Sequence, residues 1–348
     1  MDTKTLVELS LCSVKGKGFK GNKATFSKED VGSALREEFR ALAGSVNEFM
    51  KNRYDIYQII IEVADDIVPS RIEEVLGAVA EIETVPQGQT AKFRKKMGHR
   101  RAKTFLTQVG LSGVYETFRL DKVDFEVPAT AIGGGATIDF ERFLDGAEDM
   151  VDIMNIFTEA TVEAIFGEVQ KALRAALNAK GRPAANKVIA SGFDARAMHK
   201  MIGVVKTYGN GAAIFATEEF VTEMGADAIV PGGANYQGVY AEDDINSIHE
   251  TGLIRVFRGT PIIVLPQSYT DVDNKQTTLD PQMAYVLPTN GEKVVKIALE
   301  GEQQINDFKN RDNSMEIYTY RKVGVAILTH YNWGIYQNTE INQTYKGL

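Results

Sequence analysis

Hydrophobic residues recur every three or four positions in two stretches of the chain, and this period predicts two amphipathic helices. The first begins after Ser27, an N-cap residue with Asp30 three positions later. The second covers residues 139–180 and meets a stop signal at Gly181. Because residues 148–180 alone would span about 50 Å at the helical rise, the second helix is a long rod. The apolar positions of the first helix are Val31, Leu35, Phe39, Leu42, Val46 and Phe49.

Alternation of polar and apolar residues predicts a long two-stranded ribbon between the two helices. Residues 122–127, KVDFEV, have the period of two expected for a strand with one solvent-facing side. Residues 88–105, GQTAKFRKKMGHRRAKTF, have no apolar periodicity and are expected to form its tip. An isolated ribbon is marginally stable in water, so one of about 50 residues must lie on its own domain or on a neighbouring molecule.

The remaining segments predict a mixed α+β class. The first 27 residues, rich in Lys, Gly and Ser, are expected to form an extended arm. Pro69 is expected to divide the apolar stretch from Ile56 into two short helical or mixed pieces, before a strand at AEIETV. The C-terminal half alternates helix and strand. Its predicted elements are helices at 193–209, 216–226 and 242–252, two strands around a turn at 259–261, and three or four strands within 294–333.

Length and composition are those of a globular protein. The chain has 348 residues, 44% of them hydrophobic and 25% charged, which allows two or so compact units. Cys12 is the one cysteine, so an internal disulfide framework is excluded and folding in a reducing compartment is expected. Neither a signal peptide nor an apolar stretch of about 18 residues is present, so we expect no membrane segment.

Charge is segregated along the chain. The net charge is −8, yet residues 84–115 contain no acid and seven Lys or Arg, so the remainder carries −8 − 7 = −15. A basic ribbon on an acidic molecule favours a protein contact between copies, because complementary charge orients the encounter. Nucleic-acid binding and an inert solvated loop are the weaker alternatives. The predicted contact residues are Lys92, Arg94, Lys95, Lys96, Arg100, Arg101 and Lys103.

Candidate chemistry is sparse, and we predict no catalytic, cofactor or metal site. The four histidines fall on four different predicted elements, without metal-ligand spacing. The stretch AIGGGAT, residues 131–137, lacks the Lys-Ser/Thr of a phosphate loop and is predicted to be a flexible joint between ribbon and rod. Cys12 lies in the predicted extended arm, where a base that could activate its thiol would be hard to hold in place. The acid clusters EVADD and AEDD are expected to be solvated helix ends.

The order of these elements resembles the major capsid protein of tailed bacteriophages, with the HK-ninety-seven-type shell fold. The resemblance rests on four stretches: residues 56–88 before the ribbon, the rod DGAEDMVDIMNIFTEATVEAIFGEVQKALRAAL, the helix and hairpin at 243–267, and the closing RKVGVAILTHYNWGIYQN. It implies an α+β capsid shell fold with an N-terminal arm, a β-ribbon called the E-loop, a spine helix in a peripheral domain and a compact axial domain. The implied ranges are about 1–55 for the arm, 56–81 for the start of the peripheral domain, 82–132 for the E-loop, 133–185 for the spine region, 186–289 for the axial domain, 290–322 for peripheral strands and 323–348 for the axial return.

The resemblance also implies a function. The chain would be a structural protein, not an enzyme, that self-assembles into hexamers and pentamers of an icosahedral shell around double-stranded DNA. It would be assembled in the host cytoplasm and reside in the virion, with a separate scaffolding protein and a portal as partners, weak contact with DNA and no membrane. Some relatives join an E-loop Lys to a neighbour covalently; nothing in this sequence selects a Lys, so no cross-link is expected.

Two other interpretations stay open at this point. An encapsulin-like compartment would keep the fold and enclose an enzyme as cargo. An α+β enzyme would use the loop at Gly133–Gly135 to bind its ligand.

Overall fold

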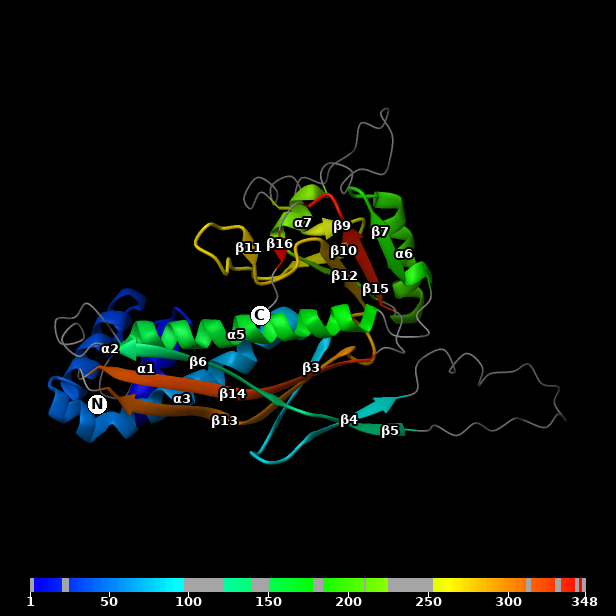
Figure 1. Ribbon diagram of the computed structural model, residues 1–348. Coiled ribbons are helices and arrows are strands. Elements are labelled where there is room, and N and C mark those ends of the chain that lie inside the picture. Colours follow the sequence, from blue (N-terminus) through cyan, green and yellow to red (C-terminus); the bar gives the residue numbers. More distant parts are fainter. Residues whose placement is uncertain are drawn as a thin grey trace.

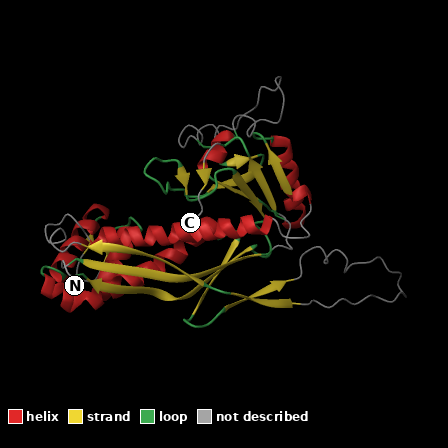
Figure 2. Ribbon diagram, viewed as in Figure 1, coloured by secondary structure: helices red, strands yellow, loops and turns green. Residues whose placement is uncertain are grey.

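Two β-sheets and two long helices organise the protein (Figure 1). Figure 2 shows the long helices on one face of an extended sheet, and the second sheet on the other side of one of them. The computed structural model describes residues 3–20, 25–96, 122–138, 150–177, 184–209, 211–224, 253–310, 314–328, 333–341 and 344–345.

The N-terminal region is helical, so the predicted extended arm is wrong. Helix α1 (Thr3–Val14) buries Leu6, Val7 and Leu9 against the next two helices, which gives this short segment a tertiary reason to be helical. Helix α2 (Lys28–Leu42) begins as predicted, because the Ser27 side chain accepts a hydrogen bond from the Asp30 N–H at 3.3 Å. A short hairpin, β1 (Phe19–Lys20) with β2 (Thr25–Phe26), lies between them.

The predicted first helix ends earlier than expected, and the next one is longer. Ser45 caps helix α3 (Val46–Leu76), because its side chain accepts a hydrogen bond from the Glu48 N–H. The apolar residues predicted for one helix, Val31 to Phe49, are therefore divided between α2 and α3. Helix α3 runs through Pro69, and the predicted division there is wrong. An interior Pro costs a helix about 3 kcal/mol. Burial of apolar side chains on both sides of it, including Val68 and Ile72, offsets that cost.

A four-stranded sheet forms the long axis of the molecule. Its order is β3-β13-β14-β6, and β3 is parallel to β13 while the other pairs are antiparallel. The segment predicted to contain three or four strands is largely one long hairpin, β13–β14, with an irregularity at Gly301, whose φ is 70°. The strands are β3 (Ala80–Val85), β13 (Val295–Lys309), β14 (Met315–Ile327) and β6 (Thr130–Ile138).

A six-stranded sheet forms the second unit. Its order is β7-β15-β12-β8-β10-β9, and β7, β15, β8 and β10 run parallel to one another. Helices α6 (Ala195–Gly209) and α7 (Glu218–Glu223), both predicted as helices from the sequence, pack on one face of it. The strands are β7 (Lys187–Ala190), β15 (Gly334–Asn338), β12 (Met283–Leu287), β8 (Ala213–Ala216), β10 (Thr260–Val264) and β9 (Val256–Phe257). A one-turn helix η2 (Ala184–Asn186) and the pair β11 (Gln276–Thr277) and β16 (Thr344–Tyr345) complete the unit.

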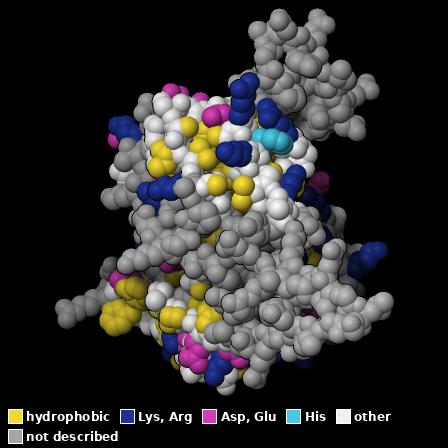
Figure 3. Space-filling model, turned by 90° about the vertical axis from the view of Figure 1, so that its right-hand side faces the viewer, with side chains coloured by type: hydrophobic (Ala, Val, Ile, Leu, Met, Phe, Trp, Pro, Cys, Tyr) yellow, Lys and Arg dark blue, Asp and Glu magenta, His cyan; other side chains and the backbone are white. Residues whose placement is uncertain are grey.

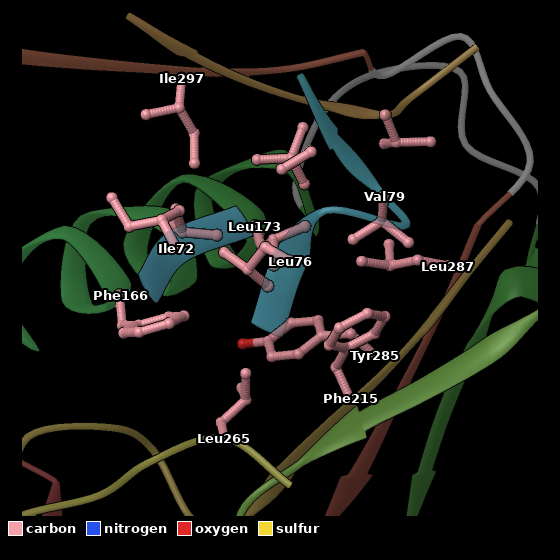
Figure 4. Packing of buried hydrophobic residues seen from close by; sticks show 14 of the residues in the cluster. Ile72, Leu76, Val79, Phe166, Leu173, Phe215, Leu265, Tyr285, Leu287 and Ile297 are labelled. Carbon is pink, nitrogen blue, oxygen red and sulfur yellow. The ribbon is translucent and has the colours of Figure 1, made fainter. Parts of the chain in front are cut away.

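Helix α5 (Met150–Leu177) connects the two sheets and confirms the predicted rod in the described range. Its apolar side chains reach the four-stranded sheet and the six-stranded sheet in one continuous core. Figure 4 shows Phe166 and Leu173 from α5 near Leu76 of α3, with Phe215 and Tyr285 approaching from the six-stranded sheet. The rod therefore holds the two units together through burial of apolar surface.

Some predicted elements lie outside the described residues. They are the helix at 242–252, the stop signal at Gly181 and the first part of the rod, 139–149. Within the described part of the chain, no helix has the length and apolar character needed to cross a membrane.

Candidate inter-subunit surfaces

The base of the predicted ribbon is present. Strand β4 (Ala91–Lys96) pairs antiparallel with β5 (Lys122–Val127), from Ala91 opposite Val127 to Lys96 opposite Lys122. The two strands leave the four-stranded sheet together (Figure 1). Of the range assigned to the ribbon, residues 82–85 belong to β3 and residues 130–132 to β6, and both lie in the four-stranded sheet.

The polar side of the ribbon base carries two cross-strand ion pairs. Lys92 Nζ lies 3.3 Å from Glu126 Oε1, and Arg94 Nε donates to Asp124 Oδ1 at 3.0 Å. Residues directly opposite each other on antiparallel strands interact in this way. These two predicted contact cations are therefore already paired with carboxylates of their own ribbon.

The apolar side of the ribbon base packs on the four-stranded sheet. Ala91, Phe93 and Val127 are buried together with Ala298 of β13. Lys296 Nζ lies 5.8 Å from the centroid of the Phe93 ring, a cation–π contact. Because a short ribbon is marginal alone, this small cluster is what holds its base in place.

The turn that leads into the ribbon is anchored by one carboxylate. Glu300 Oε1 accepts a hydrogen bond from Lys322 Nζ at 2.8 Å and another from the Gly88 N–H at 2.9 Å. These two hydrogen bonds hold the pKa of Glu300 below its ordinary value, and the bond from Lys322 has the larger effect. The turn between β3 and β4 is thus tied to the neighbouring hairpin.

The other five predicted contact residues have different placements. Lys95 and Lys96 lie on β4, where the register puts them opposite Val123 and Lys122. Arg100, Arg101 and Lys103 lie outside the described residues.

A large groove lies between α5 and the six-stranded sheet, and the sequence did not reveal it. Its volume is about 1400 Å³, and its lining comes from α1, α3, α5, α7 and the segment after β10. Strands β8 and β10 end there, and Glu340 lies just after the end of β15. The carboxyl ends of the parallel strands therefore meet at this edge of the sheet.

The groove is strongly acidic. Among the described residues that line it, one is a cation, Arg71, and seven are glutamates. Two of the carboxylates are held in place: Glu163 Oε2 accepts from the Ser268 hydroxyl at 2.9 Å, and Glu219 Oε1 accepts from Gln267 Nε2 at 3.0 Å. The glutamates are Glu74, Glu159, Glu163, Glu218, Glu219, Glu223 and Glu340.

A buried joint fixes α5 to the six-stranded sheet. Gln170 Oε1 accepts from the Asp280 N–H at 2.7 Å, and Gln170 Nε2 donates to the Asp280 carbonyl at 3.3 Å. Arg174, one turn further along α5, lies with Nη1 3.0 Å from Asp280 Oδ2. Burial raises the pKa of Asp280, while the Gln282 N–H and Arg174 act in the opposite direction.

One predicted acid cluster is structural rather than solvated. In EVADD, Asp65 Oδ1 lies 2.9 Å from Nη1 of the buried Arg321 on β14, so the expectation of a solvated helix end is wrong for this residue. Burial raises the pKa of Asp65, and Arg321 opposes that effect. The second cluster, AEDD, lies outside the described residues.

The glycine stretch is a strand, so both the flexible-joint and the ligand-loop interpretations are wrong. Gly133–Gly135 lie in β6, paired with Tyr320, Thr319 and Tyr318 of β14. A Cβ on Gly133 would lie 2.5 Å from the Thr319 carbonyl oxygen. Gly133 is therefore needed for the close approach of the two strands, whereas a Cβ on Gly134 would meet nothing within 4 Å.

The other candidate residues stay apart. His199 is exposed on α6, Cys12 is half-buried in α1, and the other three histidines lie outside the described residues. Among the described residues, no three His, Cys, Asp or Glu side chains gather as a metal site. In Figure 3, Lys and Arg side chains surround the histidine on the α6 side of the molecule. The sequence places Arg196, Lys200 and Lys206 on α6, and Arg255 and Arg258 beside β9.

The chain is similar to capsid proteins in sequence and in structure. The family described as "SPbeta prophage-derived putative capsid protein YonB" matches residues 15–337. No curated protein matches. The satellite phage P4 procapsid, solved with its size determination (Sid) protein, has a TM-score of 0.51 at 9% identity, covering 81% of this chain and 92% of that chain.

Two further solved structures are similar. The mature capsid of bacteriophage PhiM1 has a TM-score of 0.49 at 11% identity, covering 76% of this chain and 86% of that chain. A virus-like particle from Pyrococcus furiosus has a TM-score of 0.47 at 14% identity, covering 80% of this chain and 98% of that chain. The likeness to the P4 procapsid shows a shared fold, that of the phage capsid shell.

Proposed function

Because the chain belongs to the YonB family of prophage-derived capsid proteins, we propose that it is a major capsid protein whose copies form an icosahedral shell around double-stranded DNA. The family match over residues 15–337 is the observation that carries this proposal. The phage capsid shell fold supports it. The role is structural: the protein encloses DNA and catalyses no reaction.

The copies would assemble into hexamers and pentamers in the host cytoplasm and remain in the virion. A separate scaffolding protein and a portal would take part, and the DNA would be contacted weakly. We assign the six-stranded sheet to the axial domain, at about 186–289 and 328–348; the expected boundary at 323 moves to 328, because residues 323–327 belong to β14 of the four-stranded sheet. We assign the four-stranded sheet with α3 and α5 to the peripheral domain and its spine.

The ribbon is proposed to lie on a neighbouring subunit. Its base is anchored on its own sheet by a small apolar cluster, and its first two cations are already paired. The basic residues beyond the base would then supply the contact. Reversing Arg100 and Arg101 to Glu should impair assembly and leave the monomer folded. The matched control is R94D/D124R, which exchanges the partners of one ion pair inside the ribbon and should assemble normally.

Negative-stain electron microscopy with sedimentation velocity tests the proposal. The full chain would be expressed alone and together with the neighbouring phage genes. Closed shells, tubes or capsomer rings are the expected products, and DNA inside shells would support a phage container. A protein cargo in place of DNA would identify an encapsulin-like compartment. A monomer under every condition would refute the shell function.

A further inference from the structure

We propose that the exposed side of α6 and the adjoining β9–β10 hairpin bind the phosphate backbone of the enclosed double-stranded DNA. The inference rests on the proposed shell function, because the shell supplies the DNA. It adds which surface of the subunit lines the interior of the shell. We call this surface the basic face, and its cations are Arg196, Lys200, Lys206, Arg255 and Arg258.

Two acid-free segments supply the basic face. Residues 195–217 and 253–270 contain no Asp or Glu, although the whole chain has a net charge of −8. Lys206 Nζ, near the end of α6, donates to the Gly259 carbonyl at 3.4 Å, and this bond joins the two segments. Without the five cations the rest of the chain carries −8 − 5 = −13, so most of the subunit repels DNA while the basic face attracts it.

Packing of α6 directs its cations to solvent. Met198, Ile202 and Val205 are buried on the side of the helix that faces the six-stranded sheet. Residues on the opposite side recur at spacings of three and four, as expected for one side of a helix. Figure 3 shows Lys and Arg side chains around the histidine on this side of the molecule. The exposed residues of this side are Arg196, His199, Lys200, Gly203 and Thr207.

The cations of the basic face are available to an anion. Among the described residues, none of the five forms an ion pair with a carboxylate, unlike the paired cations of the ribbon base. The nearest acid in the sequence, Asp194, uses its Oδ1 to accept from the backbone N–H groups of Arg196 and Ala197, at 2.8 and 3.1 Å. Arg258 is held over the Phe257 ring, with Cζ 5.4 Å from the centroid. A stacked guanidinium is well suited to phosphate because its planar donors are already oriented.

The chemistry of the basic face fits DNA better than a protein partner. Protein interfaces have an apolar centre, whereas protein–DNA interfaces are more polar and much more positively charged. Among the exposed residues of α6 that the structure describes, none is a large apolar side chain. The ten residues from Arg196 to Lys206 span about 15 Å, and B-DNA carries about nine phosphate charges over that length. Phosphates are therefore close enough together for each cation to meet one.

The salt dependence of DNA binding tests the contact. Fluorescence anisotropy would measure the affinity of the purified full chain for short DNA duplexes between about 50 and 200 mM KCl. R196Q/K200Q removes two phosphate contacts, so the affinity should fall at least about tenfold and the slope of log K against log [KCl] should become less steep by about 1.8. Duplexes of different sequence should bind equally, because phosphates carry no sequence information.

Two matched variants make this test specific. R196K/K200R keeps both charges and should keep the wild-type slope. R40Q/K51Q removes two exposed cations on α2 and α3, outside the basic face, and should also keep it. A wild-type slope in R196Q/K200Q, or an equal change in R40Q/K51Q, would overturn the proposal.

Labelling of empty closed shells tests the interior position. In the C12S background, K200C should react in intact shells with a small maleimide, and with a polymer-linked maleimide too large to cross the wall only after the shells are disrupted. Polymer labelling of intact shells would place the basic face outside and overturn the proposal, while the shell function would stand. Failure of both reagents in intact shells, or loss of shells in R196Q/K200Q with unchanged DNA affinity, would identify a contact between copies instead. Absence of shells from the wild-type chain would refute the shell function itself.

Discussion

Truncation of Phe93 should release the ribbon from its own sheet without unfolding the protein. Phe93 is 2% exposed, and it packs with Ala91, Val127 and Ala298 on the side of the four-stranded sheet away from α5. The ion pairs on the opposite side of the ribbon join β4 only to β5, so they do not hold the ribbon on the sheet. The F93A variant therefore removes the main anchor of the ribbon base.

The cost follows from the size of the cluster. Burying a Phe side chain contributes about 1.5–3 kcal/mol. Truncation in a large core costs about 3–5 kcal/mol, but this cluster is small and at the surface, so the expected loss is about 2–3 kcal/mol. That loss corresponds to a rise of about 30- to 150-fold in the population with the ribbon detached.

Hydrogen exchange measures this change locally. Amide protection in β4 and β5 should fall by that factor in F93A, whereas protection in β13 and β14 should stay within about twofold of wild type. The matched control is R94A in the same strand, which removes an exposed ion pair worth at most about 1 kcal/mol, or about fivefold in exchange. Equal loss of protection in all four strands, or no loss in β4 and β5, would refute this account of the anchor.

Three further predictions concern the folded subunit. G133A should lower the free energy of unfolding by about 1–3 kcal/mol, because the new Cβ would lie 2.5 Å from a carbonyl oxygen of β14. G134A, whose Cβ would meet nothing within 4 Å, is its control, and equal urea midpoints would contradict the prediction. K296M should cost about 3–5 kcal/mol in urea denaturation, because it removes a buried cation 3.8 Å from the buried carboxylate of Glu292; a loss below about 1 kcal/mol would count against this. Burial raises the pKa of Asp280, so the folded state binds this proton more tightly than the unfolded state. The stability of wild type relative to D280N should therefore rise as the pH falls from about 7 to about 4, and a constant difference across that range would contradict the pKa direction.

Local signals in the sequence were sufficient for several elements. The cap at Ser27, the apolar stripe of α5 and the alternation in β5 each predict an element that the structure contains. The errors arose where tertiary packing decides. Helix α1 forms on a buried apolar face that composition did not show, and α3 continues through Pro69 because its neighbours on both sides are buried.

The two candidate surfaces also differ in whether the sequence could reveal them. The basic segment is contiguous in the sequence, so its charge could be counted directly. The acidic groove takes its glutamates from α3, α5, α7 and the segment after β15, and no local pattern unites them. The pairing of Lys92 with Glu126, which are 126 − 92 = 34 positions apart in the sequence, depends on the register of two strands.

The joint at Asp280 connects the two units on either side of the acidic groove. One wall of the groove belongs to α5 and another to the segments that follow strands of the six-stranded sheet, so the angle between helix and sheet sets the width of the groove. Gln170 and Arg174 fix that angle through two backbone hydrogen bonds and one ion pair to a single buried residue. Because breaking a buried pair leaves an uncompensated charge, the joint resists rotation of the sheet against the helix. A movement of the two units during shell assembly must therefore either preserve this joint and move the units together, or break it and change the groove.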